Sequence, residues 1–168
     1  TMEGALSLGV GEPDFPTPEH VREAAIASIK KGDTKYTDNR GTVELRAAAA
    51  DYLTKFDLHY DKQDEILITM GASEGIDLAL RTLVNPGEEV LVAEPSYVSY
   101  IPCIELCGGV PVSLKLRAEN KFRLTREQLE EKITEKSKVL LISYPNNPTG
   151  AIMEKEDLEA IAEVVKEH

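Results

Sequence analysis

The sequence predicts an α/β fold with a mostly parallel sheet that carries helices on both faces. Two features predict it: short, nearly unbroken apolar runs rich in β-branched residues, and amphipathic helical patterns that separate those runs. Strands covered on both faces are apolar along their whole length, because neither face meets water. With 168 residues, the chain is long enough for one domain with a sizeable core.

Two helices precede the first predicted strand. The first begins at Thr17-Pro18-Glu19, which combines a capping hydroxyl, a proline in the first turn and an acid that complements the helix dipole. It ends near Gly32, a residue typical of helix C-termini. The second begins near Thr42. Apolar residues follow at helical spacing in both: Val21, Ala25 and Ile29 in the first, and Leu45, Ala48, Tyr52, Leu53 and Phe56 in the second.

Strand and helix signals then alternate to the end of the sequence. Strands are expected at 65–69 (EILIT), 89–93 (EVLVA), 110–116 (VPVSLKL) and 138–143 (KVLLIS), and helices at 73–84, 98–107, 125–135 and 154–168. Thr125 and Gln128 have the spacing of a capping box. The final helical pattern stops without a following strand, as if the sequence were cut from a longer enzyme.

Charge and composition exclude several classes of partner. Thirty acidic against 19 basic residues give a net charge of −11, which argues against binding to nucleic acid or to an anionic membrane surface. No apolar run reaches the ~18 residues that a membrane span needs. Two cysteines cannot form a disulfide framework, so we expect a cytoplasmic protein. Cys103 and Cys107 lack further ligands at metal-site spacing, so we expect two small buried apolar residues and no metal.

Three loops that follow predicted strands are expected to meet at one edge of the sheet, where parallel α/β proteins bind ligands. Gly71-Ala72-Ser73 lies at a strand-to-helix turn, so its amides and hydroxyl suit a phosphate monoester, although a simple capped helix fits as well. Tyr97 could lie against a flat heteroaromatic ligand or be a structural tyrosine. Asn147 could donate to a ligand oxygen or form an ordinary Asn-Pro turn.

At these residues the sequence resembles the class I/II aminotransferases, which are fold-type I enzymes dependent on pyridoxal 5'-phosphate. The similarity covers essentially the whole chain, in order and with the spacing of the family. It rests on residues 8–18 (LGVGEPDFPTP), Lys35-Tyr36-Thr37, Gly41, Leu45-Arg46, Gly71-Ala72-Ser73, Pro95-Ser96-Tyr97 and Asn146-Asn147-Pro148-Thr149-Gly150.

The resemblance implies a role for each matching residue. The Ala72 and Ser73 amides and the Ser73 hydroxyl would hold the cofactor phosphate. Tyr97 would stack on the pyridine ring, and Asn147 would hydrogen-bond the phenolic oxygen of that ring. Tyr36 would reach across a homodimer interface to the cofactor phosphate of the partner subunit. The resemblance also leads us to expect a cis peptide bond at Asn147-Pro148.

Gly11 would donate its amide to the substrate carboxylate, and the substrates would be an amino acid and a 2-oxo acid. By the same resemblance, residues 1–40 form an N-terminal segment and residues 41–168 the first half of the cofactor-binding large domain. The Schiff-base lysine, the aspartate on the pyridine nitrogen and two arginines would lie beyond His168. We therefore expect no catalytic residue in this chain and no transamination by the chain alone.

Three other functions remain open at this point. A C–S lyase of the same fold would share the cofactor contacts and differ mainly in substrate contacts beyond His168. A non-enzymatic sensor domain of a transcription regulator would resemble the family along the same stretch. An independent phosphate-binding domain would require these 168 residues to be the full length. The identity of the amino donor is not readable from this part of the sequence.

Overall fold

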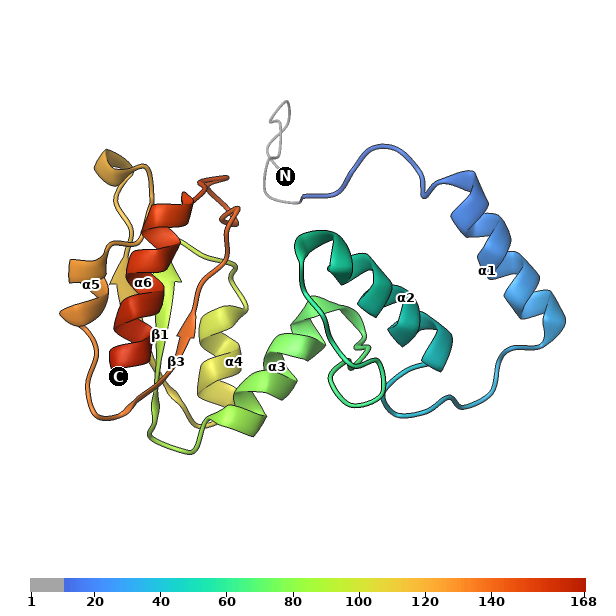
Figure 1. Cartoon of the computed structure of the whole chain (residues 1–168), viewed down its shortest axis with the longest axis horizontal. Helices are drawn as coiled ribbons and strands as arrows, with labels where there is room; N and C mark the ends of the chain where they lie inside the picture. The colour runs from blue at the N-terminus through green and yellow to red at the C-terminus, as the bar shows by residue number, and fades with distance from the viewer. Residues whose placement is uncertain (1–10) are drawn as a thin grey trace, which may run out of the picture. The chain divides into compact units, whose positions relative to one another are not determined.

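The chain divides into two compact units, which we call unit 1 (Thr1–Leu67) and unit 2 (Ile68–His168). The structure is a computed structural model, and it describes residues 11–168 (Figure 1). Residues 8–10 of the first aminotransferase-like motif lie outside the described part. Each unit has its own internal contacts.

Unit 1 contains helices α1 (Glu19–Lys31) and α2 (Val43–Leu53) and the short 3₁₀ helix η1 (Thr54–Phe56). The second predicted helix start and the predicted stop are confirmed. Helix α1 begins at Glu19, as expected, but the expected capping hydroxyl of Thr17 is wrong, because the N-cap is Pro18 and no side chain makes a capping bond there. Gly32 ends α1 in the left-handed conformation, with φ of 88°, and its amide donates to the carbonyls of the last turn. Thr42 caps α2, because its hydroxyl accepts a hydrogen bond from the Leu45 amide at 3.3 Å.

Unit 2 is built on a three-stranded parallel sheet. Its strands are β1 (Glu89–Glu94), β2 (Val110–Lys115) and β3 (Ser137–Leu141), and their order is β2-β1-β3 with β1 in the centre. The helices are α3 (Gly71–Leu83), α4 (Tyr100–Leu106), η2 (Ala118–Asn120), α5 (Arg126–Glu130) and α6 (Lys155–Glu167). The predicted α/β class with a parallel sheet is confirmed.

Helices cover both faces of this sheet (Figure 1). Because side chains alternate along a strand, Leu91 and Ala93 of β1 pack with the helices α5 and α6, whereas Val90 and Val92 pack with α3 and α4. Both faces of the central strand are therefore buried, which explains why its sequence is apolar without alternation.

The prediction of a strand at residues 65–69 is wrong. No strand is formed there, since a strand requires a hydrogen-bonded neighbour and the sheet of the described residues contains only β1, β2 and β3. Glu65 belongs instead to a local turn, in which its amide donates to the Asp61 carbonyl at 2.9 Å and its carboxylate accepts from the Asp61 amide at 2.7 Å.

The helix predicted at 125–135 is shorter than expected. Its capping box is confirmed, because the Thr125 hydroxyl accepts from the Gln128 amide and the Gln128 side chain accepts from the Thr125 amide. Helix α5 then ends at Glu130. The amides of Lys132 and Ile133 both donate to the Leu129 carbonyl, so the chain turns there toward β3.

Candidate functional site

Three segments of unit 2 form the candidate site, and each follows or precedes a regular element. Helix α3 begins at Gly71, the loop after β1 begins at Pro95, and the loop after β3 contains Asn146 and Asn147. Since β1 and β3 are parallel neighbours, the two loops that follow them leave the sheet at the same edge.

The N-terminus of α3 offers amide donors at Ala72 and Ser73, whereas the Gly71 amide donates to the Thr69 carbonyl at 2.9 Å. Its N-cap, Met70, makes no side-chain capping bond, and the first amides of a helix have no partner within the helix. Gly71 has a φ of 82°, a backbone conformation that is strained for any residue with a side chain. The space beside it is open, because an added Cβ would meet no atom within 4 Å. Ala72 and Ser73 are exposed. The donor set therefore fits a phosphate monoester, as the sequence predicts.

The Tyr97 side chain lies beside this turn. Its phenol lies close to the side chains of Ser99 and Ser73, and polar contact with them, first Ser99 and then Ser73, lowers the pKa of Tyr97. Its ring meets the buried Tyr100 ring edge to face, with centroids 5.6 Å apart. The structure thus brings together Ser73 and Tyr97, which are 24 positions apart in the sequence.

The loop after β3 holds the two adjacent asparagines in different environments. Asn147 is exposed, whereas Asn146 is only 4% exposed. The Asn146 Nδ2 donates to the Pro95 carbonyl oxygen at 3.1 Å, which links this loop to the loop that carries Tyr97. The predicted cis bond at Asn147-Pro148 is confirmed, and Glu94-Pro95 and Tyr144-Pro145 are cis as well.

The two remaining predicted site residues lie in unit 1. Gly11 is exposed, and Tyr36 is fully exposed in the segment between α1 and α2. Their predicted contacts with a substrate carboxylate and with the cofactor of a partner subunit stay predictions.

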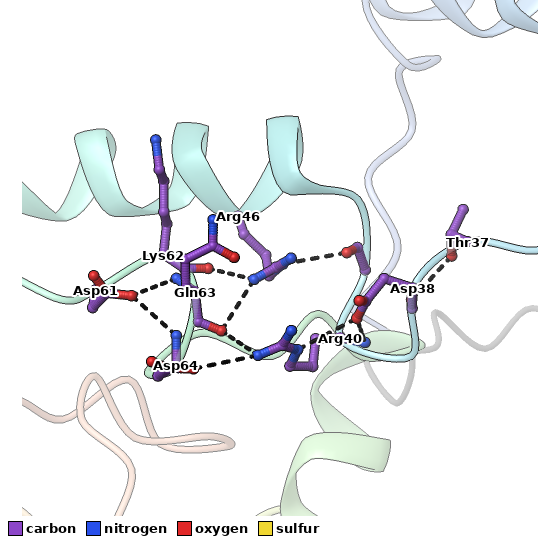
Figure 2. Close-up of polar contacts among 9 residues, drawn as sticks. Thr37, Asp38, Arg40, Arg46, Asp61, Lys62, Gln63 and Asp64 are labelled. Carbon is purple, nitrogen blue, oxygen red and sulfur yellow. Dashed lines mark hydrogen bonds and ion pairs between the residues drawn. The ribbon is translucent and has the colours of Figure 1, made fainter.

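A network of arginine hydrogen bonds holds the chain just after Tyr36 (Figure 2). Arg40 Nη1 donates to the Gln63 carbonyl at 2.5 Å, and the Arg40 amide donates to the Asp38 carboxylate at 2.8 Å. The Arg40 amide bond closes the turn at residues 38–40, whereas the Arg40 guanidinium joins this turn to residues 61–64 through Gln63 and through the Asp64 carboxylate at 3.5 Å. Hydrogen bonds from the Arg40 amide and then the Arg40 side chain hold the pKa of Asp38 below its usual range.

Arg46 completes this network from inside. It is 1% exposed, and its guanidinium donates to the carbonyls of Gly41 at 3.2 Å, Lys62 at 2.5 Å and Gln63 at 3.2 Å. A buried guanidinium is tolerated because backbone oxygens replace the water that it loses (Figure 2).

Sequence reasoning missed the roles of Asn146, Ser99 and Arg46. Each was visible as a residue type, but which of two adjacent asparagines turns inward depends on the path of the loop. A buried Arg46 is also not readable from a helical pattern, because arginine is normally exposed. Cys103 and Cys107 are free thiols that are half-buried and pack against the apolar core around Ile104, so the expectation of two small buried apolar residues is partly correct.

Residues 11–168 contain neither a metal-binding cluster nor a membrane-spanning helix. No cluster of three or more His, Cys, Asp or Glu side chains there could bind a metal ion. None of the helices in the described part has the length and apolar character to cross a membrane.

Comparison with known proteins identifies the family. The family model "Aminotransferase class I and II" matches residues 3–168. The chain is 48% identical to the putative aminotransferase YugH of Bacillus subtilis, over all of this chain and 44% of that protein. It is 45% identical to aromatic-amino-acid aminotransferase 2 of Thermococcus litoralis, over 99% of this chain and 43% of that protein.

Solved structures agree. The aromatic aminotransferase of Pyrococcus horikoshii superimposes with a TM-score of 0.93 at 43% identity, and the aspartate aminotransferase of Rhizobium meliloti with 0.92 at 40% identity. These matches cover 95% and 96% of this chain and 43% and 40% of the matched chains, so the chain spans less than half the length of its relatives. The chain belongs to the class I and II aminotransferase family.

Proposed function

We propose that these 168 residues are the N-terminal part of a pyridoxal-phosphate-dependent aminotransferase, which transfers an amino group from an amino acid to a 2-oxo acid. One observation carries the proposal: the uncapped N-terminus of α3, with its Ser73 hydroxyl, lies beside the Tyr97 phenol at the carboxyl edge of a parallel sheet. A phosphate donor set next to an aromatic ring suits a ligand that combines a phosphate with a flat ring. Membership of the family supports the same conclusion.

The phosphate would be held by backbone and hydroxyl donors of α3. The Ala72 and Ser73 amides point along the helix axis toward its N-terminal end, where the helix dipole favours negative charge. The Ser73 hydroxyl adds a donor that can rotate to suit the anion. The Tyr97 hydroxyl, which lies close to the Ser73 side chain, would help to orient it.

The ring of the cofactor would contact Tyr97 and Asn147. Tyr97 would cover one ring face, and the Asn147 amide would donate to the phenolic oxygen. When bound, pyridoxal phosphate supplies an aldehyde that takes up the amino group and a ring that accepts the electron pair left by the Cα proton. The residues of this chain would hold and orient that ring, while the proton is moved by a lysine that we place outside these 168 residues.

Unit 1 would contribute to the same reaction through two exposed residues. We propose that the Gly11 amide binds the substrate carboxylate and that Tyr36 completes the phosphate site of the partner subunit in a homodimer. Residues 1–40 would form the N-terminal segment, and residues 41–168 the first part of the large domain. Free cysteines support the cytoplasmic location that we propose.

The test uses the intact protein that contains this chain. It is loaded with pyridoxal phosphate and given a panel of amino acids, including aspartate and aromatic donors, with 2-oxoglutarate. We expect stoichiometric glutamate and the matching 2-oxo acid. Pyruvate and ammonia without a new amino acid would contradict transamination and indicate a C–S lyase. DNA binding without turnover would indicate a sensor.

A further inference from the structure

Asn146 is the buried polar residue of unit 2, and its side chain makes three hydrogen bonds. Besides donating to the Pro95 carbonyl at 3.1 Å, it accepts two hydrogen bonds at Oδ1, from the Thr149 amide at 3.1 Å and the Thr149 hydroxyl at 2.8 Å. Its backbone is paired as well, because its amide donates to the Ala151 carbonyl and its carbonyl accepts from the Gly150 amide, each at 2.8 Å. The residue is therefore fixed in position.

These bonds connect two loops that follow adjacent parallel strands. Pro95 directly follows β1 and lies two positions before Tyr97. Asn146 follows β3 and directly precedes Asn147. The Asn146 side chain is thus the hydrogen-bonded link between the segment that carries the candidate ring-stacking residue and the segment that carries the candidate ring-oxygen donor.

The link requires a carboxamide. It uses one donor, directed at a backbone carbonyl, and one oxygen that accepts two bonds. A carboxylate of the same shape would keep the acceptor but place negative charge against the Pro95 carbonyl oxygen. An alanine would leave the Pro95 carbonyl and the Thr149 amide without their partner in a partly buried place.

We propose that Asn146 is a positioning residue, which sets the Asn147 side chain and the Tyr97 ring relative to one another so that both contact the same cofactor ring. The proposal rests on the proposed function, because it assigns both neighbours to the pyridoxal phosphate site. Asn146 itself acts through its two neighbours. The exposed Asn147 makes the contact with the cofactor ring, and the buried Asn146 holds Asn147 in position.

The experiment compares four variants of the intact protein: Asn146→Ala, Asn147→Ala, the double variant, and Leu129→Ala. Leu129 is 1% exposed and packs on the opposite sheet face from Tyr97, so it is a control for general loss of stability. The dissociation constant of pyridoxal phosphate and the absorption maximum of the bound cofactor are measured. Thr149→Val, which removes one bond to Asn146 Oδ1, serves as a milder variant if Asn146→Ala does not fold.

We expect Asn146→Ala to weaken cofactor binding about tenfold, the effect of losing one well-placed hydrogen bond. The absorption maximum should shift in the same direction as in Asn147→Ala, since both lose the bond to the ring oxygen. The double variant should bind only slightly more weakly than Asn147→Ala, because no Asn147 amide is left to position. Thr149→Val should show a smaller shift of the same sign, and Leu129→Ala none.

Two results would overturn the inference. One is a loss of cofactor affinity in the double variant that equals the product of the losses in Asn146→Ala and Asn147→Ala. The other is a loss of cofactor affinity in Leu129→Ala equal to that in Asn146→Ala, together with no shift of the absorption maximum in Asn146→Ala. Either outcome would leave the proposed function intact as long as the unsubstituted protein binds pyridoxal phosphate. Failure of the unsubstituted protein to bind it would instead contradict the proposed function itself.

Discussion

Every buried apolar side chain among residues 11–168 lies in unit 2, whereas the buried side chain of unit 1 is the guanidinium of Arg46. Unit 2 has two apolar cores, one on each face of its sheet. Unit 1 has amphipathic helices whose apolar side chains stay accessible: Val21, Ile26 and Ile29 of α1 are 46%, 51% and 67% exposed.

The two units define the path of the chain in different ways. In unit 2, the packed sheet places the loops that follow its strands, so residues far apart in sequence meet at one edge. In unit 1, hydrogen bonds from arginines and helix caps define the chain path. Helices of 11 to 13 residues are marginal in water without a packed apolar face, so unit 1 depends on its polar contacts.

The largest expected difference concerns buried and exposed isoleucines. Ile104→Ala in unit 2 should lower the free energy of unfolding by about 2–5 kcal/mol, because Ile104 is fully buried and leaves a cavity. Ile29→Ala in unit 1 should change it by no more than about 0.5 kcal/mol. Urea titration of the intact protein measures both. Similar losses of unfolding free energy in the two variants would contradict this difference between the units.

The next effect tests the polar core of unit 1. Arg46→Met keeps an apolar stem but leaves the carbonyls of Gly41, Lys62 and Gln63 without their donor, at a cost of about 1–3 kcal/mol. Hydrogen exchange should become faster at the amides of residues 63–65. Arg40→Met is the matched control: its side chain is 45% exposed, so water can replace it and the effect should be smaller. The reverse order would contradict our account.

Removal of a helix cap should lower stability by the same amount in both units, because a cap is a local interaction. Thr42→Ala and Thr125→Ala each remove a hydroxyl that accepts a helix amide, and each should lower stability by about 1 kcal/mol. Thr42→Ser and Thr125→Ser keep the hydroxyl and should restore most of the loss. A large cost in one unit alone would show that the cap matters through tertiary packing.

The smallest effects are pH dependences of opposite direction. The folded-state pKa of Asp38 in unit 1 is below its ordinary value of 3.8, chiefly through the Arg40 amide, so its contribution is present above that value and is lost as the pH falls. Burial raises the pKa of Tyr144 in unit 2 above 10.0, so its contribution is present below that value and is lost as the pH rises.

Difference titrations check both. Asp38→Asn should shift the unfolding midpoint at neutral pH but not in strong acid. Replacing Tyr144 by Phe should remove tyrosinate absorbance from the high-pH part of the titration, above the ordinary tyrosine range. A midpoint shift for Asp38→Asn that persists in strong acid would contradict the assignment to the ionised carboxylate.

The sequence is sufficient to predict features that depend on near neighbours. Thr42, Gly32 and the Thr125–Gln128 pair mark helix ends because a cap involves residues three or four positions apart. The α/β class is equally readable, because an unbroken apolar run such as β1 needs cover on both faces. The Gly71–Ser73 turn is readable from its small residues before a helical pattern.

Other features depend on distant partners. The apolar run at 65–69 has strand composition, yet a strand needs a neighbouring strand, and composition does not say where that neighbour lies. The inward turn of Asn146 depends on the position of the Pro95 carbonyl, 51 residues away in sequence. The burial of Arg46 likewise depends on three carbonyls presented by two separate segments.

We propose above that the N-terminus of α3 holds the phosphate of pyridoxal phosphate. The most direct test compares binding of this cofactor with binding of pyridoxal, which lacks the phosphate. Ser73→Ala is compared with Ser113→Ala, a matched control because the buried Ser113 hydroxyl has no hydrogen-bond partner. We predict that Ser73→Ala weakens binding of pyridoxal phosphate by about tenfold or more, the effect of one hydrogen bond to a charged group, and leaves binding of pyridoxal unchanged. Ser113→Ala should change neither. Equal losses for both ligands in Ser73→Ala, or no loss for either, would contradict the claim.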